Sequence, residues 1–323
     1  MIMVGDLSLS LDRREAGANL DFVSHAHGDH ISSIRSSKSV FASDITVDLI
    51  EAIYGRKVQR TAEAPKSLKL INAGHIFGSK QVVIDDENTG EKIVYTGDFN
   101  MQRSMVCEPI EIESADTVIV DSTYPYPDVR FDDRTETETA IQKWTENKLG
   151  QGIVLFGAYA LGKSQEIISI LNDSSIVPVV NRKISRVCKV YQKNGMSLDY
   201  ASMYEDNRYD RDRLVRGNFV GIVEPHMLST ITAQLKSIYN KPVFTAVATG
   251  FAEMMKFGTD AQFPLSDHAD FTQATEYIDA TGAKLVYTRG SAAKEMAANL
   301  VEKGYKASIY GGTIKMAAEL IQQ

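Results

Sequence analysis

The sequence predicts an α/β protein in which one domain, built around metal-binding motifs, is interrupted by a second domain. Histidine and aspartate motifs occur within the first 121 residues and again around residue 268. Between them, apolar strands alternate with helices, which is typical of βα units around a parallel sheet. The simplest topology joins residues 1–124 and 265–323 into one domain, with residues 125–264 inserted as another.

The first part of the chain reads as short strands separated by Gly, Asn and Asp turns. Apolar runs predict strands at residues 21–24, 68–71, 82–84, 91–96 and 117–120. Active-site groups commonly lie on loops that a rigid sheet holds in place. The polar residues that directly follow these strands are therefore candidates for a functional site.

From residue 133 onward the pattern changes to alternating helices and strands. We expect helices at 133–149, 163–171 and 183–192, and strands at 153–156, 176–180, 219–223 and 243–248. After residue 268 we expect a helix at 272–280, a strand at 285–287 and a helix at 292–303. The single tryptophan, Trp144, should anchor the first of these helices to the core of the inserted domain.

Five of the six histidines fall into three short motifs. The first motif, residues 24–30, is an H-x-H-x-D-H run, and a second histidine motif and a lone aspartate follow two of the predicted strands. Imidazole and carboxylate ligands without thiolate suit Zn²⁺, Mn²⁺ or Fe in a hydrolytic or oxidative site. The candidate residues are His25, His27, Asp29, His30, His75, Asp98 and His268.

Gly28 marks a tight turn directly after the strand at 21–24. On such a turn, His25 and His27 can face one metal ion while Asp29 and His30 face a second. Asp98 has two carboxylate oxygens and could bridge both ions. The sixth histidine, His226, lies outside this scheme and is expected in a surface loop.

Composition sets outer limits on the function. A hydrophobic content of 43% and a charged content of 24% are ordinary for globular proteins. No apolar run of 18 residues predicts a membrane-spanning helix, and the first residues do not form a signal peptide. Two cysteines fit a reducing cytosol, so we expect a cytoplasmic location. The net charge of −7 argues weakly against broad nucleic-acid binding.

Taken together, the motifs resemble the β-CASP branch of the metallo-β-lactamase superfamily over nearly the whole chain. The matching segments are SHAHGDH (24–30), AGHIFGS (73–79), TGDF (96–99), DSTY (121–124) and LSDHADF (265–271). This branch contains the pre-mRNA 3′-end cleavage endonuclease, J-type ribonucleases and DNA-processing nucleases. The sequences GAYALGKS (157–164) and LSDHADF (265–271) most resemble the corresponding segments of ligase-associated exonucleases and prokaryotic RNA-processing relatives.

The resemblance implies a four-layer αββα metallo-β-lactamase domain with an inserted β-CASP domain. It assigns His25, His27, His75 and Asp98 to one metal ion, and Asp29, His30 and Asp98 to another. Asp121 and His268 match an acid that orients a histidine near the scissile phosphate.

One position departs from the family pattern. The family usually has a third histidine motif near residue 289, but this chain has Arg289 in YTRG. A cation beside the second ion disfavours its binding. We therefore expect one firmly bound Zn²⁺ and a second site that is weak or empty, with Mn²⁺ as an alternative ion.

The implied function is a metal-dependent phosphodiesterase that cleaves RNA or DNA. A bound ion lowers the pKa of water and so supplies hydroxide as the nucleophile. Asp29, His268 and Asp121 would be the catalytic side chains. Two alternatives stay open: a hydrolase of a small ester, thioester or phosphodiester, and a degenerate subunit that binds nucleic acid without cutting it. We expect nucleic acid as the partner and no membrane, and a homodimer is also open.

Residues 157–164 also satisfy the Walker A pattern, G-x4-G-K-S, between a predicted strand and a predicted helix. Taken alone, this motif would indicate an ATPase or GTPase. Backbone N–H groups at a helix N-terminus bind any phosphate. We therefore expect Gly162, Lys163 and Ser164 either to contact the phosphates of a nucleic-acid substrate or to form a purely structural turn. Arg289 is a further candidate for contact with the substrate phosphate.

Overall fold

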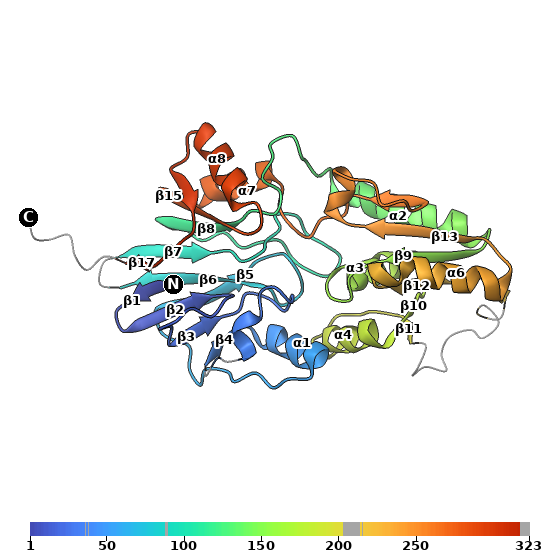
Figure 1. Cartoon of the computed structure of the whole chain (residues 1–323), viewed down its shortest axis with the longest axis horizontal. Helices are drawn as coiled ribbons and strands as arrows, with labels where there is room; N and C mark the ends of the chain where they lie inside the picture. The colour runs from blue at the N-terminus through green and yellow to red at the C-terminus, as the bar shows by residue number, and fades with distance from the viewer. Residues whose placement is uncertain (36, 38, 88–89, 203–213, 215, 317–323) are drawn as a thin grey trace, which may run out of the picture. The chain divides into compact units, whose positions relative to one another are not determined.

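The computed structural model describes residues 1–35, 37, 39–87, 90–202, 214 and 216–316 (Figure 1). The chain divides into two compact units. Unit 1 comprises Met1–Arg103, Cys107–Arg130 and His268–Gln323, and unit 2 comprises Ser104–Val106 and Phe131–Asp267. The inserted segment thus begins at residue 131 and ends at 267, a few residues later at each end than the sequence analysis placed it.

Unit 1 contains two mixed sheets. The first sheet has the strand order β17 (Ile314–Lys315), β1 (Ile2–Val4), β2 (Leu7–Leu11), β3 (Leu20–Phe22) and β4 (Val40–Phe41). The second has the order β16 (Ala307–Ile309), β15 (Leu285–Arg289), β8 (Thr117–Asp121), β7 (Glu91–Tyr95), β6 (Lys80–Asp86) and β5 (Leu68–Asn72). β5, β6 and β7 pair antiparallel, whereas β7, β8, β15 and β16 pair parallel.

The period-two alternation of the second sheet explains how unit 1 is layered. On β6, Val82 and Ile84 belong to a core shared with Leu9 and Phe22 of the first sheet. Val83, between them, points to the opposite face and joins a core formed with two helices. These helices are α7 (Phe271–Thr281) and α8 (Ala293–Glu302). Figure 1 shows α7 and α8 beyond the second sheet and α1 (Asp44–Tyr54) beside β4 of the first, as an αββα arrangement requires.

Helix α1 was not predicted from the sequence. It contains five β-branched residues, which favour strands when propensity alone is considered. The structure shows that its ends decide the outcome. Ser43 caps the N-terminus by accepting a hydrogen bond from Thr46 N, and Gly55 ends the helix at a φ of 64°.

Unit 2 is built on one six-stranded sheet in which every neighbouring pair is parallel, as the βα alternation predicts. Its order is β11 (Ala201–Ser202), β10 (Val179–Val180), β12 (Val220–Val223), β9 (Ile153–Gly157), β13 (Val243–Ala248) and β14 (Ala261–Phe263). The helices are α2 (Arg134–Leu149), α3 (Lys163–Asp173), α4 (Arg182–Lys193) and α6 (Leu228–Tyr239). The α/β class predicted for the chain is confirmed.

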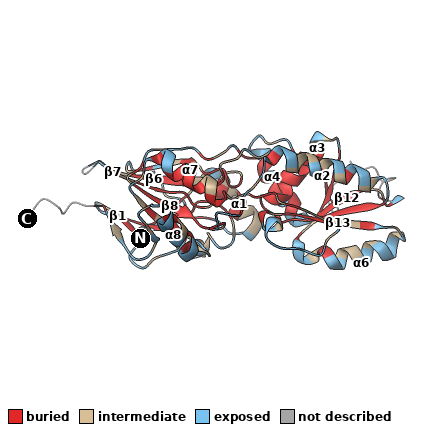
Figure 2. Ribbon diagram, turned by 90° about the horizontal axis from the view of Figure 1, so that it is seen from above, coloured by how far each residue is buried: buried red, intermediate tan, exposed pale blue. Residues whose placement is uncertain are grey.

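Short 3-10 turns complete the described structure: η1 (Ser32–Arg35), η2 (Pro225–Met227) and η3 (Gly250–Glu253). Figure 2 shows β12 and β13 buried and much of α6 exposed, and Leu228 is the buried residue of that helix. Trp144 of α2 packs with its ring edge against Phe156 and Phe263, at centroid distances of 6.0 and 5.9 Å. Among the described residues, no helix combines the length and apolar character needed to cross a membrane.

Candidate metal centre

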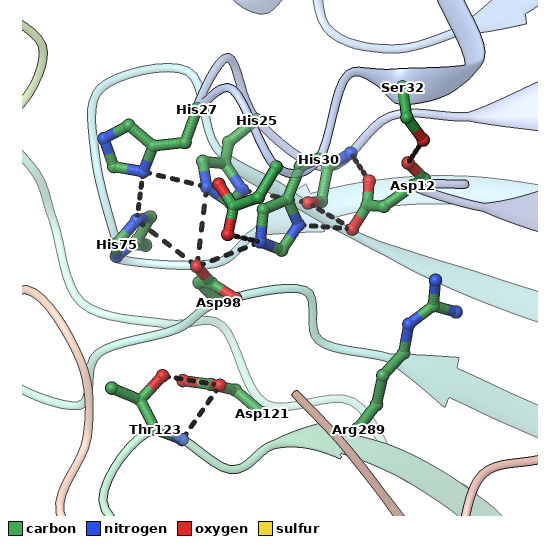
Figure 3. Close-up of polar contacts among 12 residues, drawn as sticks. Asp12, His25, His27, His30, Ser32, His75, Asp98, Asp121, Thr123 and Arg289 are labelled. Atoms are coloured by element: carbon green, nitrogen blue, oxygen red, sulfur yellow. Dashed lines mark hydrogen bonds and ion pairs between the residues drawn. The ribbon is translucent and has the colours of Figure 1, made fainter. Parts of the chain in front are cut away.

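Three loops of unit 1 bring four ligand-type side chains together. His25 and His27 follow β3, His75 follows β5, and Asp98 follows β7. One nitrogen or oxygen atom from each lies within 4.8 Å of the others (Figure 3). His27 Nδ1 lies 3.0 Å from both His25 Nε2 and His75 Nε2. Asp98 Oδ2 lies 3.5 Å from His25 Nε2 and 3.8 Å from His75 Nε2.

These separations fit a shared cation. Tetrahedral Zn²⁺ with ligand bonds near 2.0–2.2 Å places neighbouring ligand atoms roughly 3.3–3.6 Å apart. Three imidazole nitrogens that converge on one point cannot all be satisfied by each other, because each neutral ring has one donor and one acceptor nitrogen. His25, His27, His75 and Asp98 could therefore hold a metal ion.

A second group of ligand-type atoms shares Asp98. His30 Nε2 lies 3.3 Å from Asp98 Oδ2 and 3.5 Å from Asp29 Oδ2. Asp98 Oδ2 therefore faces both groups, while the Asp29 side chain is 81% exposed. This is the arrangement in which one carboxylate oxygen could serve two ions.

Charge inside the cluster shifts its protonation. Burial lowers the pKa of His30, but the carboxylates of Asp98 and Asp12 outweigh it and raise this pKa to about 11. Burial raises the pKa of Asp98, but His30 and His25 outweigh it and lower this pKa well below its usual range. Burial and the neighbouring His30 lower the pKa of His25. The protein thus holds Asp98 ionised and His25 neutral, which are the forms that bind metal.

Asp12 is a candidate functional residue that the sequence analysis missed. Its buried carboxylate accepts hydrogen bonds from His30 Nδ1 at 2.8 Å, Tyr95 Oη at 2.6 Å and Ser24 N at 2.7 Å. Ser24 Oγ also donates to it at 2.8 Å and lies 3.0 Å from His25 Nδ1. Asp12 thereby fixes the rings of both histidines, leaving their Nε2 atoms toward Asp98. The sequence signal was an alternating strand, LSLSL, that ends in an aspartate.

Two glycines allow the ligand loops to pack closely. Gly74, before His75, has a φ of 77°, and a Cβ there would lie 2.3 Å from Asn100 O. Gly97, before Asp98, has a φ of 57°, and a Cβ there would lie 2.5 Å from Ser24 Cβ. Both positions combine a left-handed conformation with a close contact, so only glycine fits.

Asp121 and His268 form a pair beside this cluster. His268 Nδ1 donates to Asp121 Oδ2 at 2.8 Å. Asp121 Oδ1 accepts from Thr123 N at 3.1 Å and from Thr123 Oγ1 at 2.9 Å. The His268 ring lies 4.5 Å from the His75 ring, and Asp98, Asp121 and His268 form a third group of ligand-type residues. The pair therefore lies close to where the cluster could hold an ion.

Arg289 ends β15 next to Asp121 of β8, but its side chain turns toward β2 (Figure 3). One guanidinium nitrogen donates to Leu11 O. The guanidinium carbon lies 5.3 Å from the Tyr95 ring centroid and 5.4 Å from that of Tyr310. The guanidinium of Arg289 therefore packs against β2 and two tyrosine rings. The sequence analysis had instead expected it to lie beside the second ion and to contact the substrate phosphate.

The Walker-like residues of unit 2 also use their polar groups internally. Lys163 Nζ is buried and donates to Glu166 Oε2 at 2.9 Å, Leu265 O at 2.8 Å and Asp267 Oδ1 at 2.6 Å. Ser164 Oγ donates to Tyr159 O, and Gly162 N donates to Gln165 Oε1. The expected phosphate contacts therefore have no free donor in the Lys163 ammonium. His226, in η2, is exposed as expected.

No protein-family model matches the chain, but curated proteins do. A probable DNA ligase of Opitutus terrae is 29% identical over 300 residues, which are 90% of this chain and 28% of the ligase. An RNase J-like protein of Methanocaldococcus jannaschii is 29% identical over 181 residues, 47% of this chain and 42% of that protein. This chain thus spans less than half the length of either relative.

Two further similarities bear on the family and the fold. An uncharacterized protein of Acidianus ambivalens, named for its place in the lig 3′ region, is 34% identical over 145 residues, 44% of this chain and 97% of that protein. A crystal structure of a protein of unknown function from Enterococcus faecalis superposes with a TM-score of 0.59 and 12% identity. It covers 91% of this chain and 79% of the other, so the two share a fold.

Proposed function

Because the chain belongs to the β-CASP branch of the metallo-β-lactamase superfamily, we propose that it is a metal-dependent nuclease that hydrolyses phosphodiester bonds. The observation that carries this proposal is the His268–Asp121 pair beside the three-histidine cluster. A cluster of metal ligands alone would suit many hydrolases. A carboxylate-held imidazole next to it adds a group that can serve a phosphate or its leaving oxygen.

In this proposal, His25, His27, His75 and Asp98 hold a firmly bound Zn²⁺. Asp29, His30 and Asp98 hold a weaker second ion, which Mn²⁺ could replace. When bound, the metal supplies a Lewis acid that activates water and offsets phosphate charge. Asp29, exposed at the edge of the cluster, orients the attacking water.

His268 donates a hydrogen bond or proton to the phosphoryl or leaving oxygen. Asp121 acts through His268, because its carboxylate fixes the imidazole and makes the ring more basic. Thr123 in turn holds the other oxygen of Asp121.

We propose DNA as the substrate in preference to RNA. The relative that aligns over 90% of this chain is named a probable DNA ligase, whereas the RNase J-like protein aligns over 47%. A nuclease that trims DNA ends would act on the same substrate as a ligase. A cytoplasmic location and a homodimer, both expectations from the sequence, belong to this proposal, and size-exclusion chromatography with light scattering tests the dimer.

The test is digestion of end-labelled single- and double-stranded DNA and RNA with added Zn²⁺ or Mn²⁺, resolved on a sequencing gel. We expect shortened DNA products whose ladder reports the polarity of cleavage. A His25→Ala/His27→Ala double variant is the control for a contaminating nuclease. Metal-loaded protein that binds DNA and leaves it intact would contradict the proposal, and cleavage of RNA alone would reverse the substrate preference.

A further inference from the structure

Arg289 lies within unit 1, where its partly buried cation calls for an explanation. Its guanidinium rests between the rings of Tyr95 and Tyr310 and donates one hydrogen bond, to Leu11 O. Its Nη1 atom is buried without a hydrogen-bond partner among the described residues. Guanidinium groups stack on aromatic faces and bind a carbonyl in a fixed plane, which an ammonium does not do as well.

Both contacts of Arg289 lead to Asp12. Leu11, whose carbonyl accepts from Arg289, directly precedes Asp12 at the end of β2. Tyr95, whose ring lies under the guanidinium, donates its hydroxyl to Asp12 Oδ2 at 2.6 Å. Asp12 itself has a φ of 53°, a strained conformation for a non-glycine residue that its surroundings must maintain.

Asp12 then determines the orientation of His30. The same Oδ2 atom accepts from His30 Nδ1 at 2.8 Å. With Nδ1 committed, His30 Nε2 is directed to Asp98 at 3.3 Å and Asp29 at 3.5 Å. A shift of the Leu11–Asp12 backbone would therefore rotate or release this imidazole.

We propose that Arg289 is a positioning residue for His30, acting through the Leu11–Asp12 strand end and Tyr95. The inference rests on the proposed function in that His30 helps to hold the second ion. The inference also predicts the opposite of what the charge of Arg289 alone would predict for binding of the second ion. A cation near an ion should weaken binding, whereas a positioning residue should strengthen it.

Two substitutions separate these effects. Arg289→Lys keeps the charge and loses the planar donor, while Arg289→Gln keeps an N–H donor and loses the charge. The measurement is titration of apoprotein with Zn²⁺ and with Mn²⁺ by calorimetry, without nucleic acid. Both variants should weaken the second ion by about 10–100-fold, as is usual when a residue supporting a metal ligand is lost. The first ion should be weakened less than the second, because Asp12 reaches His25 only through Ser24 Oγ, whereas it contacts His30 directly. Far-UV circular dichroism shows that each variant is folded.

Tyr95→Phe, which keeps the ring and removes the bond to Asp12, should weaken the second ion in the same direction. Arg103→Gln, at a side chain of unit 1 that is 73% exposed, is the matched control and should change neither ion. Tighter binding in Arg289→Gln with no change in Arg289→Lys would overturn the inference in favour of simple repulsion.

Proton NMR of the metal-free protein tests the position of His30 independently of ion binding. The His30 Nδ1 proton, held by a carboxylate, should give a downfield proton resonance in the wild type that is absent in His30→Gln. It should broaden or disappear in Arg289→Lys. An unchanged His30 resonance in both Arg289 variants would also overturn the inference, even if no second ion binds. Because neither readout uses cleavage, an inactive protein could still support it, and an active nuclease could still contradict it.

Discussion

His268, like His30, donates from its Nδ1 atom to a carboxylate, whereas His25 does not. In His268 this atom donates to Asp121, whose other oxygen is held by Thr123. The His25 ring, by contrast, is held by Ser24 and turns its Nε2 toward other ligand atoms. The contact with Asp121 fixes the His268 ring, as the contact with Asp12 fixes the His30 ring, so metal content must separate the proposed role toward substrate from a ligand role.

We expect His268→Ala to reduce nuclease activity by about 10²–10⁴-fold, the usual contribution of a general acid or base. Metal content should stay at the wild-type value. Asp121→Asn should lose less activity, because it only orients and polarises the ring. Activity assays paired with metal analysis of each variant check this, with His226→Ala as the control at an exposed histidine. Loss of an ion from His268→Ala would instead make His268 a ligand.

The raised pKa of His30 predicts that ion binding at its site releases a proton. Asp98 and Asp12 hold this pKa at about 11, against the ordinary value of 6.5. At pH 7–8 the ring is therefore protonated until an ion, which needs the neutral form, displaces the proton. Affinity for the second ion should rise with pH up to about 11. Calorimetry in two buffers of different ionisation enthalpy should give about one proton released, and a value of zero would contradict the prediction.

At the scale of the elements, the loops that follow β5 and β7 depend on glycines as much as on ligands. Gly74→Ala should displace His75, because the new Cβ would meet Asn100 O at 2.3 Å. Gly90→Ala is a matched control, with a similar φ of 71° but no atom within 4 Å. We expect weaker binding of the first ion in Gly74→Ala only, measured by competition with a chelating dye. Equal losses in both variants would implicate backbone strain instead of the contact.

Lys163, at the start of α3, should matter for the stability of unit 2. It shares Glu166 with Arg134, and burial of the ammonium leaves two carboxylates dependent on it. Lys163→Met should cost about 3–5 kcal/mol, the usual effect of removing one partner from a buried ion pair. Lys183→Met is the control within the same unit, because the Lys183 side chain is 55% exposed and its buried partner Glu224 also accepts a hydrogen bond from Asn181. Its loss of stability should therefore be smaller than that of Lys163→Met. Urea denaturation measures the free energy of unfolding of both variants. If Lys163→Met lost little stability but showed a raised KM for nucleic acid, Lys163 would instead be a phosphate contact.

The elements show which features the sequence could predict. Strands such as β7 and β8 were predictable because they contain apolar runs bounded by turn residues. The candidate ligand Asp98 follows β7, and Asp121 is the last residue of β8. The direction of the Lys163 and Arg289 side chains was not predictable. Lys163 has a local partner in Glu166, but it also donates to Leu265 O, 102 residues away, and Arg289 donates to Leu11 O, 278 residues away. No local pattern encodes the two distant contacts. Asp12 did have a local signal, because it directly follows the alternating strand β2, but nothing in the sequence indicates its contact with Tyr95, 83 residues beyond it.

For the whole molecule, the ligand-type residues all belong to unit 1, so ions should stabilise that unit selectively. A ligand at a hundred times its Kd stabilises the state that binds it by about 2.7 kcal/mol. We expect Zn²⁺ to raise the unfolding temperature of unit 1 and a chelator to lower it, as followed by calorimetry. An equal shift of every transition would contradict this selectivity.

Trp144 makes that selectivity visible by optical means. It is the chain's sole tryptophan, and it packs between Phe156 and Phe263, entirely within unit 2. Emission excited at the red edge therefore reports on one half of the protein, whereas circular dichroism averages over both. Thermal unfolding followed by tryptophan fluorescence and by circular dichroism should give different midpoints when Zn²⁺ is added. The fluorescence midpoint should hardly change. Trp144 is thus an intrinsic fluorescent probe of unit 2, and the unfolding of the two units can be followed separately without an added label.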